Sequence, residues 1–341
     1  MELFDHPDFD GHEQVVFAHD SNSGLRAIIA VHDTRLGPAL GGCRIWRYSS
    51  DGEALTDVLR LSRGMSYKAA LADLPLGGGK SVMLVTGDRP KTPAMMQALG
   101  SAIDRLGGRY IAAEDVGATV ADMDQVATRT GHVSGNSGGV GDPSPWTARG
   151  VFLSIEAAAR HRLGRGVGDL SVSVSGLGSV GGQLCRMLAE AGARLVVSDV
   201  RAEAVAAVVA ATGAGREAPE AAHRAAVDVF APCALGAVLN SRTIPEISAK
   251  IVCGAANNQL SASSDDALLA DREILYAPDY LVNVGGLISV SRPPTGIGDA
   301  AAKAKLEAIP ATLLSVFEKA DAESIAPGAA ADALARGRLG M

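Results

Sequence analysis

The sequence predicts an α/β protein of two domains, the second of which is a doubly wound parallel sheet. Short runs rich in β-branched residues alternate with amphipathic, Ala-rich segments, as expected where helices connect parallel strands. The length of 341 residues suits two domains at roughly 150 residues each. The segment 134–143 is dense in Gly, Ser and Asn, which favour turns. We therefore place the boundary there, with domains over 1–140 and 141–324.

The composition excludes several other classes of protein. Hydrophobic residues (47%) and charged residues (20%) are balanced as in ordinary globular proteins. A nucleic-acid surface needs clustered basic residues and stacking rings, whereas this chain has a net charge of −7 and 4% aromatic residues. No stretch approaches the ~18 consecutive apolar residues of a membrane-spanning helix, and the acidic start is unlike a signal peptide. We expect a cytoplasmic protein with no nucleic-acid or membrane partner.

The four cysteines lie far apart and lack the short spacings of zinc ligands. They predict neither a metal site nor a disulfide framework. Buried, reduced thiols are expected at Cys43, Cys185, Cys233 and Cys253.

The first domain is predicted to mix strands and helices. Runs of β-branched residues predict strands over 14–19, 25–32, 80–85 and 109–112. Longer segments in which apolar residues recur at helical spacing predict helices over 52–73, 92–106 and 119–130. The first two of these helices connect one predicted strand to the next.

The second domain is predicted to begin with a helix. Ser144 is placed to cap it, Pro145 occupies its first position, and Gly164 ends it. Strands follow over 170–175, 194–198, 227–231, 250–254 and 274–277, at the spacing of successive βα units. The pair Pro293-Pro294 is expected to close this domain. The Ala-rich tail over 325–341 is expected to pack back on the first domain.

A glycine-rich motif directly after the strand over 170–175 predicts a dinucleotide site. Its first glycine permits a tight turn, its second lets the backbone approach a pyrophosphate, and its third lets helix and strand pack closely. Because a strand precedes it and a helix follows it, this interpretation is stronger than that of a simple glycine-rich turn. The motif consists of Gly176, Leu177, Gly178, Ser179, Val180 and Gly181.

Asp199 favours NAD as the cofactor. It directly follows the strand over 194–198, where a carboxylate accepts hydrogen bonds from the ribose hydroxyls and repels a 2′-phosphate. Arg201 leaves the strictness against NADP open, because a nearby guanidinium can neutralise that phosphate.

Two lysines of the first domain suit the chemistry of an amino acid. Lys68 falls on the helix over 52–73, and Lys80 follows three glycines at the mouth of a strand. An ammonium that is desolvated beside another loses its proton more easily, so one lysine can act as a base while the other holds a carboxylate. Glu114 and Asp115, at the end of the strand over 109–112, are a further candidate pair, although helix capping alone also accounts for such charges.

Taken together, seven ordered motifs resemble the family of leucine, valine, phenylalanine and glutamate dehydrogenases, in particular its leucine/phenylalanine branch. They cover almost the whole chain: GPALGGCR at 37–44, LGGGK at 76–80, AEDVG at 113–117, GDPSPWTA at 141–148, APCALG at 231–236, AANNQL at 255–260 and YAPDYLVNVGG at 276–286. The resemblance implies that the first domain binds the substrate and forms the contacts of a homo-oligomer built from dimers. It implies that the second domain is a Rossmann domain that binds NAD.

The reaction implied by the resemblance is the NAD-dependent, reversible oxidative deamination of an L-amino acid to a 2-oxo acid and ammonia. Lys80 resembles the general base that activates water, and Asp115 the residue that moves protons to and from the departing ammonia. Lys68 resembles the ligand of the substrate carboxylate, helped by the backbone near Gly41 and by Asn258. Contacts to the nicotinamide and its ribose are implied at Thr147, Ala231 and Asn257.

The side-chain pocket implied by the resemblance is apolar and is formed near Leu40, Ala113, Leu287 and Val290. A second carboxylate buried there would lack a cation, so glutamate and aspartate are predicted to be very poor substrates. Ala113 resembles leucine-type enzymes, whereas Leu287 resembles the phenylalanine type. We favour branched-chain amino acids such as leucine and valine, with phenylalanine or another aromatic amino acid as the alternative.

Two other functions would use the same scaffold. An NAD-dependent cyclase or lyase would not need Lys80, and a non-catalytic sensor of NAD and an amino acid would be expected to lose at least one of the three site residues. Lys68, Lys80 and Asp115 are all present, which favours the dehydrogenase. Two departures from the family concern substrate range and oligomer size: the run over 261–266 lacks the expected basic residues, and the tail from Pro293 is short and Ala-rich.

Overall fold

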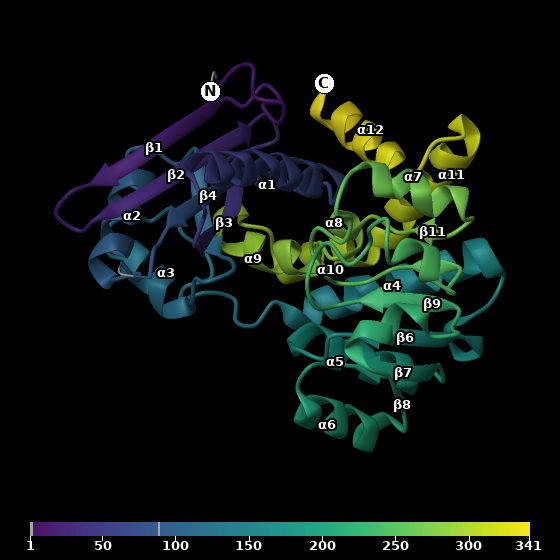
Figure 1. Cartoon of the computed structure of the whole chain (residues 1–341). Helices are drawn as coiled ribbons and strands as arrows, with labels where there is room; N and C mark the ends of the chain where they lie inside the picture. The colour runs from purple at the N-terminus through teal and green to yellow at the C-terminus, as the bar shows by residue number, and fades with distance from the viewer. Residues whose placement is uncertain (1–2, 88) are drawn as a thin grey trace. The chain divides into compact units, whose positions relative to one another are not determined.

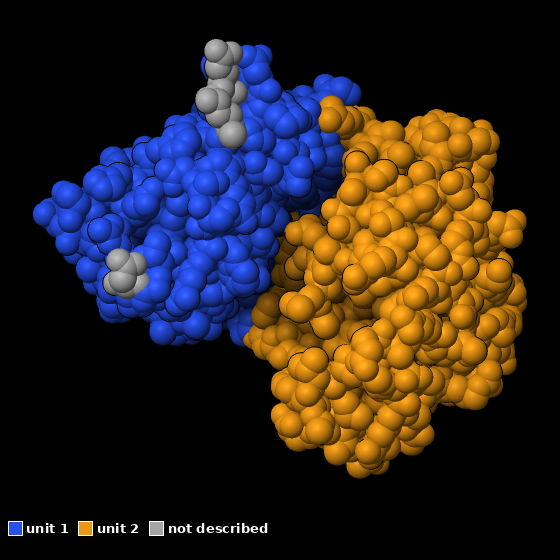
Figure 2. All heavy atoms as spheres, viewed as in Figure 1, with its two compact units in different colours: residues 1–141, 290–299, 338–341 blue, residues 142–289, 300–337 orange. Residues whose placement is uncertain are grey.

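A computed structural model describes residues 3–87 and 89–341. The chain divides into two compact units, coloured separately in Figure 2. Unit 1 consists of Met1–Gly141, Val290–Asp299 and Arg338–Met341, and unit 2 of Asp142–Ser289 and Ala300–Gly337. Each unit has its own sheet, and the predicted α/β fold class is confirmed.

Unit 1 contains a five-stranded mixed sheet of order β1-β2-β4-β3-β5 (Figure 1). The pairs β1–β2 and β2–β4 are antiparallel, whereas β3 pairs in parallel with both β4 and β5. The strands are β1 (Gln14–Asp20), β2 (Leu25–Asp33), β3 (Ala39–Trp46), β4 (Gly77–Leu84) and β5 (Tyr110–Glu114).

Helices cover both faces of this sheet. They are α1 (Asp51–Leu71), α2 (Pro93–Asp104) and α3 (Val120–Ala127). On one face, Val58 and Leu59 of α1 belong to an apolar cluster with Val82 of β4. On the other face, Leu99 of α2 and Val126 of α3 belong to a second cluster that includes Met83. Burial of apolar surface against both faces therefore fixes the sheet between two helical layers.

Unit 2 contains a six-stranded sheet of order β11-β10-β9-β6-β7-β8 in which every pair is parallel. From β6 the chain proceeds to β7 and β8 on one side, and then to β9, β10 and β11 on the other. The order thus reverses between β6 and β9, where doubly wound sheets bind ligands at the carboxyl ends of their strands. The strands are β6 (Ser171–Ser175), β7 (Arg194–Ser198), β8 (Gly215–Arg216), β9 (Val229–Pro232), β10 (Ile251–Val252) and β11 (Leu275–Tyr276).

The remaining helices lie mostly in unit 2. The chain passes from unit 2 to unit 1 within α9 and again near the end of α12, where Arg338 donates to the backbone carbonyls of Ala70 (3.0 Å) and Leu71 (2.8 Å). The helices are α4 (Ser144–Leu163), α5 (Ser179–Glu190), α6 (Ala202–Thr212), α7 (Ser264–Asp271), α8 (Asp279–Val282), α9 (Gly285–Thr295), α10 (Asp299–Glu307), α11 (Ile309–Glu323) and α12 (Pro327–Leu339).

The sequence analysis missed β3 and placed the start of β4 too late. Gly41 and Gly42 disfavour a strand by local propensity, but β3 is held by pairing with a neighbour on each side. β4 begins at Gly77, so Lys80 lies inside the strand and not at its mouth. The tertiary pairing of the sheet thus overrides a glycine-rich local sequence.

Two predicted boundaries in the second half are also wrong. Pro143, and not Ser144, is the N-cap of α4; Ser144 is the first helical residue, and its N–H donates to Asp142 (2.8 Å). Pro293 and Pro294 do not close the second domain: they lie inside α9, in a segment that belongs to unit 1, and unit 2 resumes at Ala300. Pro294 has no N–H for the carbonyl of Val290, and the Ser134 hydroxyl donates to that carbonyl instead (2.9 Å). The predicted end of α4 is confirmed, since Gly164 adopts the left-handed conformation there.

The described cysteines are all free thiols, with Cys233 half-buried and the other three buried. Within the described ranges, no helix has the length and apolar character that a bilayer crossing requires.

Candidate active site

The predicted catalytic residues lie on the face of the unit 1 sheet that α1 covers. Side chains alternate between the faces of a strand, and the strand pairing aligns Leu40 with Gly78 and Gly42 with Ala113. Lys80 is two residues beyond Gly78 on β4, and Asp115 is two residues beyond Ala113. The structure therefore places Leu40, Lys80, Ala113 and Asp115 on one face.

Lys80 and Asp115 form a buried ion pair. Lys80 Nζ lies 2.6 Å from Asp115 Oδ2, and their side chains are 7% and 17% exposed. Arg44 Nε donates to the same oxygen at 3.2 Å. Burial raises the pKa of Asp115, but the positive charges of Lys80 and Arg44 outweigh this effect and lower the pKa to about 2. Asp115 is therefore a carboxylate at neutral pH and accepts hydrogen bonds from two cations.

Glycines allow this close packing. A Cβ atom at Gly78 would lie 2.0 Å from the backbone nitrogen of Ser66, so only glycine lets α1 approach β4 this closely. Ser66 and Gly78 stand two residues before Lys68 and Lys80, respectively. Lys68 is half-buried in the last turn of α1. The contact thus brings the segments that carry the two lysines together.

The backbone at Gly41 is held by a buried tyrosine. Tyr110 Oη donates to the Gly41 carbonyl (2.7 Å) and hydrogen-bonds to Ser81 Oγ (3.0 Å). The apolar residues predicted for the pocket are Leu40 (1% exposed) and Ala113 (7%) in unit 1, the half-buried Val290 in unit 1, and Leu287 (5%) in unit 2.

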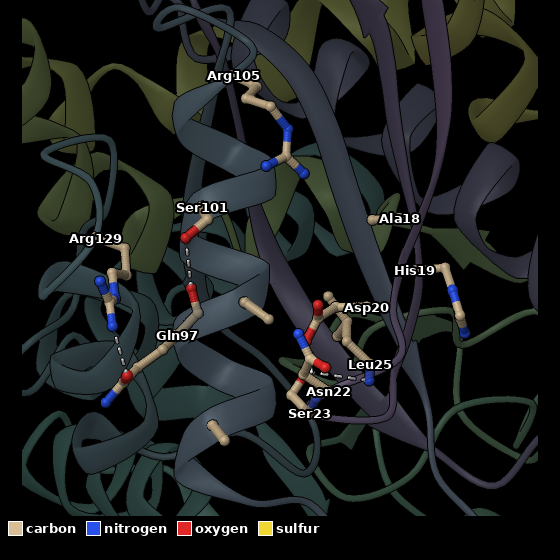
Figure 3. A pocket seen from close by; sticks show the side chains of 12 residues that line it. Ala18, His19, Asp20, Asn22, Ser23, Leu25, Gln97, Ser101, Arg105 and Arg129 are labelled. Carbon is tan, nitrogen blue, oxygen red and sulfur yellow. Dashed lines mark hydrogen bonds between the residues drawn. The ribbon is translucent and has the colours of Figure 1, made fainter.

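A hollow elsewhere in unit 1 is distinct from these residues. It lies between the β1–β2 turn and α2, and its polar wall includes Asp20, Gln97, Ser101 and Arg129 (Figure 3). Arg129 donates to Gln97 at 3.1 Å. None of the predicted site residues lines it, so it is not part of the candidate active site.

The glycine-rich motif of unit 2 forms the turn between β6 and α5. Gly176 has φ +101°, and a Cβ atom at Gly181 would lie 1.9 Å from the Gly176 carbonyl oxygen. Gly178 is the N-cap of α5, makes no side-chain cap, and has open space where a Cβ atom would stand. The first N–H groups of α5 therefore lack a side-chain acceptor, as expected where a pyrophosphate binds. Leu177 completes this turn, and Ser179 and Val180 are the first residues of α5.

Asp199 stands at the carboxyl end of β7 and is anchored to the motif. Its Oδ2 accepts from the Leu177 N–H at 2.6 Å, and its Oδ1 accepts from Arg201 Nε at 3.1 Å. The hydrogen bond from Arg201 is the largest effect that lowers the pKa of Asp199 to about 2. The carboxylate is therefore ionised, and it already offsets the charge of Arg201.

The other predicted cofactor contacts also lie in unit 2. Ala231 is buried in β9, and the loop after β10 carries Asn257 and Asn258. Since β6, β9 and β10 are parallel neighbours, these residues and the glycine-rich turn share one edge of the sheet. Asn258 adopts a left-handed φ of +52°, and Asn257 Oδ1 accepts from Asn283 Nδ2 at 2.8 Å. Thr147 is in the first turn of α4.

Comparison with known proteins identifies the family. The dimerisation-domain model of the Glu/Leu/Phe/Val dehydrogenases matches residues 12–132, and the Glutamate/Leucine/Phenylalanine/Valine dehydrogenase model matches residues 202–292. The chain is 46% identical to leucine dehydrogenase from Geobacillus stearothermophilus, covering 99% of this chain and 94% of the relative. The chain belongs to the Glu/Leu/Phe/Val dehydrogenase family. The family assignment made from the motifs is thus confirmed.

Other members of the Glu/Leu/Phe/Val dehydrogenase family are similar over the same length. Valine dehydrogenase from Streptomyces coelicolor is 45% identical, covering 98% of this chain and 94% of the relative. The crystal structure of L-tryptophan dehydrogenase from Nostoc punctiforme has 43% identity and a TM-score of 0.85, covering 97% and 96% of the two chains. Both similarities agree with an amino-acid dehydrogenase of two domains.

The sequence analysis missed several polar residues that support the site of this family member. Arg44 was quoted only as part of a motif, although it bonds directly to Asp115. Asp57, which accepts from Arg44, and Tyr48, which donates to Asp57, gave no local signal. Tyr110 and Asn283 likewise act through neighbours that are distant in sequence.

Proposed function

We propose that the protein catalyses the reversible, NAD-dependent oxidative deamination of an apolar L-amino acid, with branched-chain substrates such as leucine and valine favoured, to a 2-oxo acid and ammonia in the cytoplasm. The observation that carries this proposal is the buried pair of Lys80 and Asp115 on the α1 face of unit 1. A lysine beside a carboxylate can accept a proton and pass it on, as deamination requires.

Each proposed role follows from the chemistry of the residue. Lys80 takes a proton from the water that attacks the imine carbon, which would otherwise be a poor nucleophile. Asp115 passes protons to and from the amino group as it leaves. Lys68 pairs with the substrate carboxylate, with help from the Gly41 backbone and Asn258. NAD, when bound, accepts the hydride from Cα.

The proposed NAD site comprises the motif over 176–181 with Asp199, Thr147, Ala231 and Asn257. Two features support it: the uncapped N-terminus of α5 suits a pyrophosphate, and the ionised Asp199 suits ribose hydroxyls. Asp199 also repels a 2′-phosphate, and the charge of Arg201 is already paired with Asp199. We therefore propose NAD rather than NADP as the preferred cofactor.

Substitution of Asp199 tests this preference. Asp199→Ala is expected to raise the KM for NAD about tenfold or more, because hydrogen bonds to a charged group contribute roughly 1.5–3 kcal/mol. The ratio of kcat/KM for NAD to that for NADP should fall at the same time, since Arg201 is released to meet a phosphate. Arg201→Ala serves as the control, with NAD kinetics close to those of the unaltered protein. An unchanged cofactor ratio in Asp199→Ala would remove Asp199 from this role.

A dehydrogenase is distinguished from its two rivals by net NADH formation. Purified protein is mixed with NAD and a panel of L-amino acids, while NADH absorbance and ammonia are both measured. The proposal expects equal amounts of the two products. Ammonia without NADH would indicate a lyase or cyclase, and binding of NAD and amino acid without either product would indicate a sensor.

We also propose that the protein forms a homo-oligomer built from dimers that contact through unit 1. The matched dimerisation-domain model over 12–132 lies within this unit. β1 is an edge strand whose Phe17 is 62% exposed, so a further surface is available for pairing. Sedimentation velocity is expected to show a species of at least twice the chain mass of 34.8 kDa. A single monomeric species at micromolar concentration would contradict this assembly.

The alternative substrate class is phenylalanine or another aromatic amino acid. Leu287 favours it, and so does the 43% identity to a tryptophan dehydrogenase. Ala113 and the leucine and valine dehydrogenases at 45–46% identity favour the branched-chain class.

A further inference from the structure

Arg44 lies between two carboxylates on the α1 face of unit 1. Its Nε donates to Asp115 Oδ2 at 3.2 Å, and its Nη1 donates to both oxygens of Asp57 at 3.1 and 3.0 Å. Tyr48 Oη donates to Asp57 Oδ2 at 2.6 Å. The guanidinium is therefore held in place by α1 and by the segment after β3, independently of Asp115.

This arrangement bears on the proton transfer proposed above. Lys80 can act as a base only when its amine is neutral. In that state the hydrogen bond between Lys80 and Asp115 joins a neutral group to a carboxylate. Arg44 is then the cation bonded to Asp115. A buried carboxylate without a cation is costly and would tend to bind a proton.

We propose that Arg44 is a positioning residue that keeps Asp115 ionised and directed at Lys80 while Lys80 carries no proton. The proposal rests on the roles given above to Lys80 and Asp115. Asp57, held in turn by Tyr48, would fix the guanidinium so that it does not leave Asp115 to pair with the substrate carboxylate. Arginine suits this task because its planar group can bond two carboxylates at once and stays charged at all working pH values.

The groups around Asp115 determine in which direction the loss of Arg44 changes proton binding by the Lys80–Asp115 pair. The thiol and the two phenols nearby are neutral, because burial raises the pKa of Cys43 to about 11 and raises those of Tyr48 and Tyr110. Glu114, the preceding residue, lies toward Gly135 instead. The cations that act directly on Asp115 are Lys80 on β4 and Arg44 on β3. Cys43, Tyr48 and Tyr110 also interact with its charge, and Asp57 on α1 bonds to Arg44.

The test is the pH profile of kcat/KM for the favoured amino acid. The acidic limb is the part of this profile in which kcat/KM falls as the pH is lowered. Loss of a fixed positive charge makes proton binding nearby more favourable, whichever member of the Lys80–Asp115 pair holds the proton. Arg44→Gln should therefore move the acidic limb to higher pH by about one unit, equivalent to roughly 1.4 kcal/mol. Arg44→Lys keeps the charge and should leave the limb close to its original position, even where kcat falls.

Two further variants separate charge from folding. Arg109→Gln breaks a more exposed pair with Glu13 in the same unit and is expected to leave the limb unchanged. The double variant Arg44→Gln/Asp57→Asn removes both partners, so that Asp57 is not left as a half-buried charge without a cation. It should fold even where Arg44→Gln does not. Its limb should move in the same direction but less far, because loss of the Asp57 charge offsets part of the loss of the nearer Arg44 charge. An unmoved limb in a folded variant without Arg44, or equal shifts in Arg44→Lys and Arg44→Gln, would overturn the proposal.

The same assays distinguish failure of this inference from failure of the proposed function. If Lys80→Ala is inactive but the limb of Arg44→Gln does not move, only the role of Arg44 is wrong. If Lys80→Ala keeps its activity, the proton-transfer roles themselves are wrong, and the role of Arg44 falls with them.

Discussion

Replacement of Lys80 by alanine is expected to lower kcat about 10³- to 10⁴-fold, because positioned acid–base groups contribute about 10²- to 10⁴-fold and both water addition and proton release depend on this amine. The dissociation constant for NAD should stay within about twofold, since every proposed cofactor contact belongs to unit 2. Stopped-flow kinetics and fluorescence titration of NAD measure the two quantities.

The variant is expected to fold, which makes this a test of chemistry. Asp115 would lose one cation, but Arg44 would still donate to its Oδ2. Lys319→Ala is a suitable control, because it removes a lysine–carboxylate pair on the surface of α11. A Lys80→Ala variant that keeps more than about a tenth of the original kcat would exclude Lys80 as the base.

Lys80 and Asp115 are expected to act together in one proton transfer. Asp115→Asn is expected to be similarly damaging. The double variant Lys80→Ala/Asp115→Asn should lose little more activity than either single variant, because removal of one member already disables the transfer. If the loss of kcat in the double variant equals the product of the two single losses, Lys80 and Asp115 act in separate steps.

Local sequence patterns predicted most elements of the fold because propensity and tertiary structure agree there. The strands β1, β2 and β7 and the helices α1 and α2 have apolar residues at the spacing of their class. β3 was missed because its glycines have a tertiary purpose. A Cβ atom at Gly42 would lie 2.7 Å from the Cβ atom of Asp115. This position of the strand therefore needs glycine, despite its low strand propensity, for Asp115 to pack beside it.

The supporting contacts of the site were harder to predict than its central residues. Lys80 and Asp115 stand beside recognisable glycine and acidic motifs. Arg44 and Asp57, in contrast, come together because β3 pairs in parallel with β4 and α1 packs against this part of the sheet. No local spacing encodes such a meeting, since it depends on the order of strands in the sheet.

Glutamate is expected to be a very poor substrate, with kcat/KM about 10²- to 10⁴-fold below that for leucine. Leu40 and Ala113 are buried and apolar, and Arg44 and Lys80 on the same face already bond to Asp57 and Asp115. A second carboxylate would be buried without a partner, which costs roughly 3–5 kcal/mol or a factor of about 10²–10³·⁵.

Three substrates of similar length separate charge from size. Methionine is apolar, glutamine is polar and uncharged, and glutamate carries the second charge. We expect kcat/KM to fall in that order, with the largest step between glutamine and glutamate because only that step adds a buried charge. Leucine, valine, phenylalanine and tryptophan complete the panel. Their kcat/KM values decide between the branched-chain and aromatic classes. The apolar pocket residues alone do not separate these classes, because one methylene changes specificity by only about 1–3 kcal/mol. Glutamate as the best substrate would show that Leu40 and Ala113 do not line the side-chain pocket.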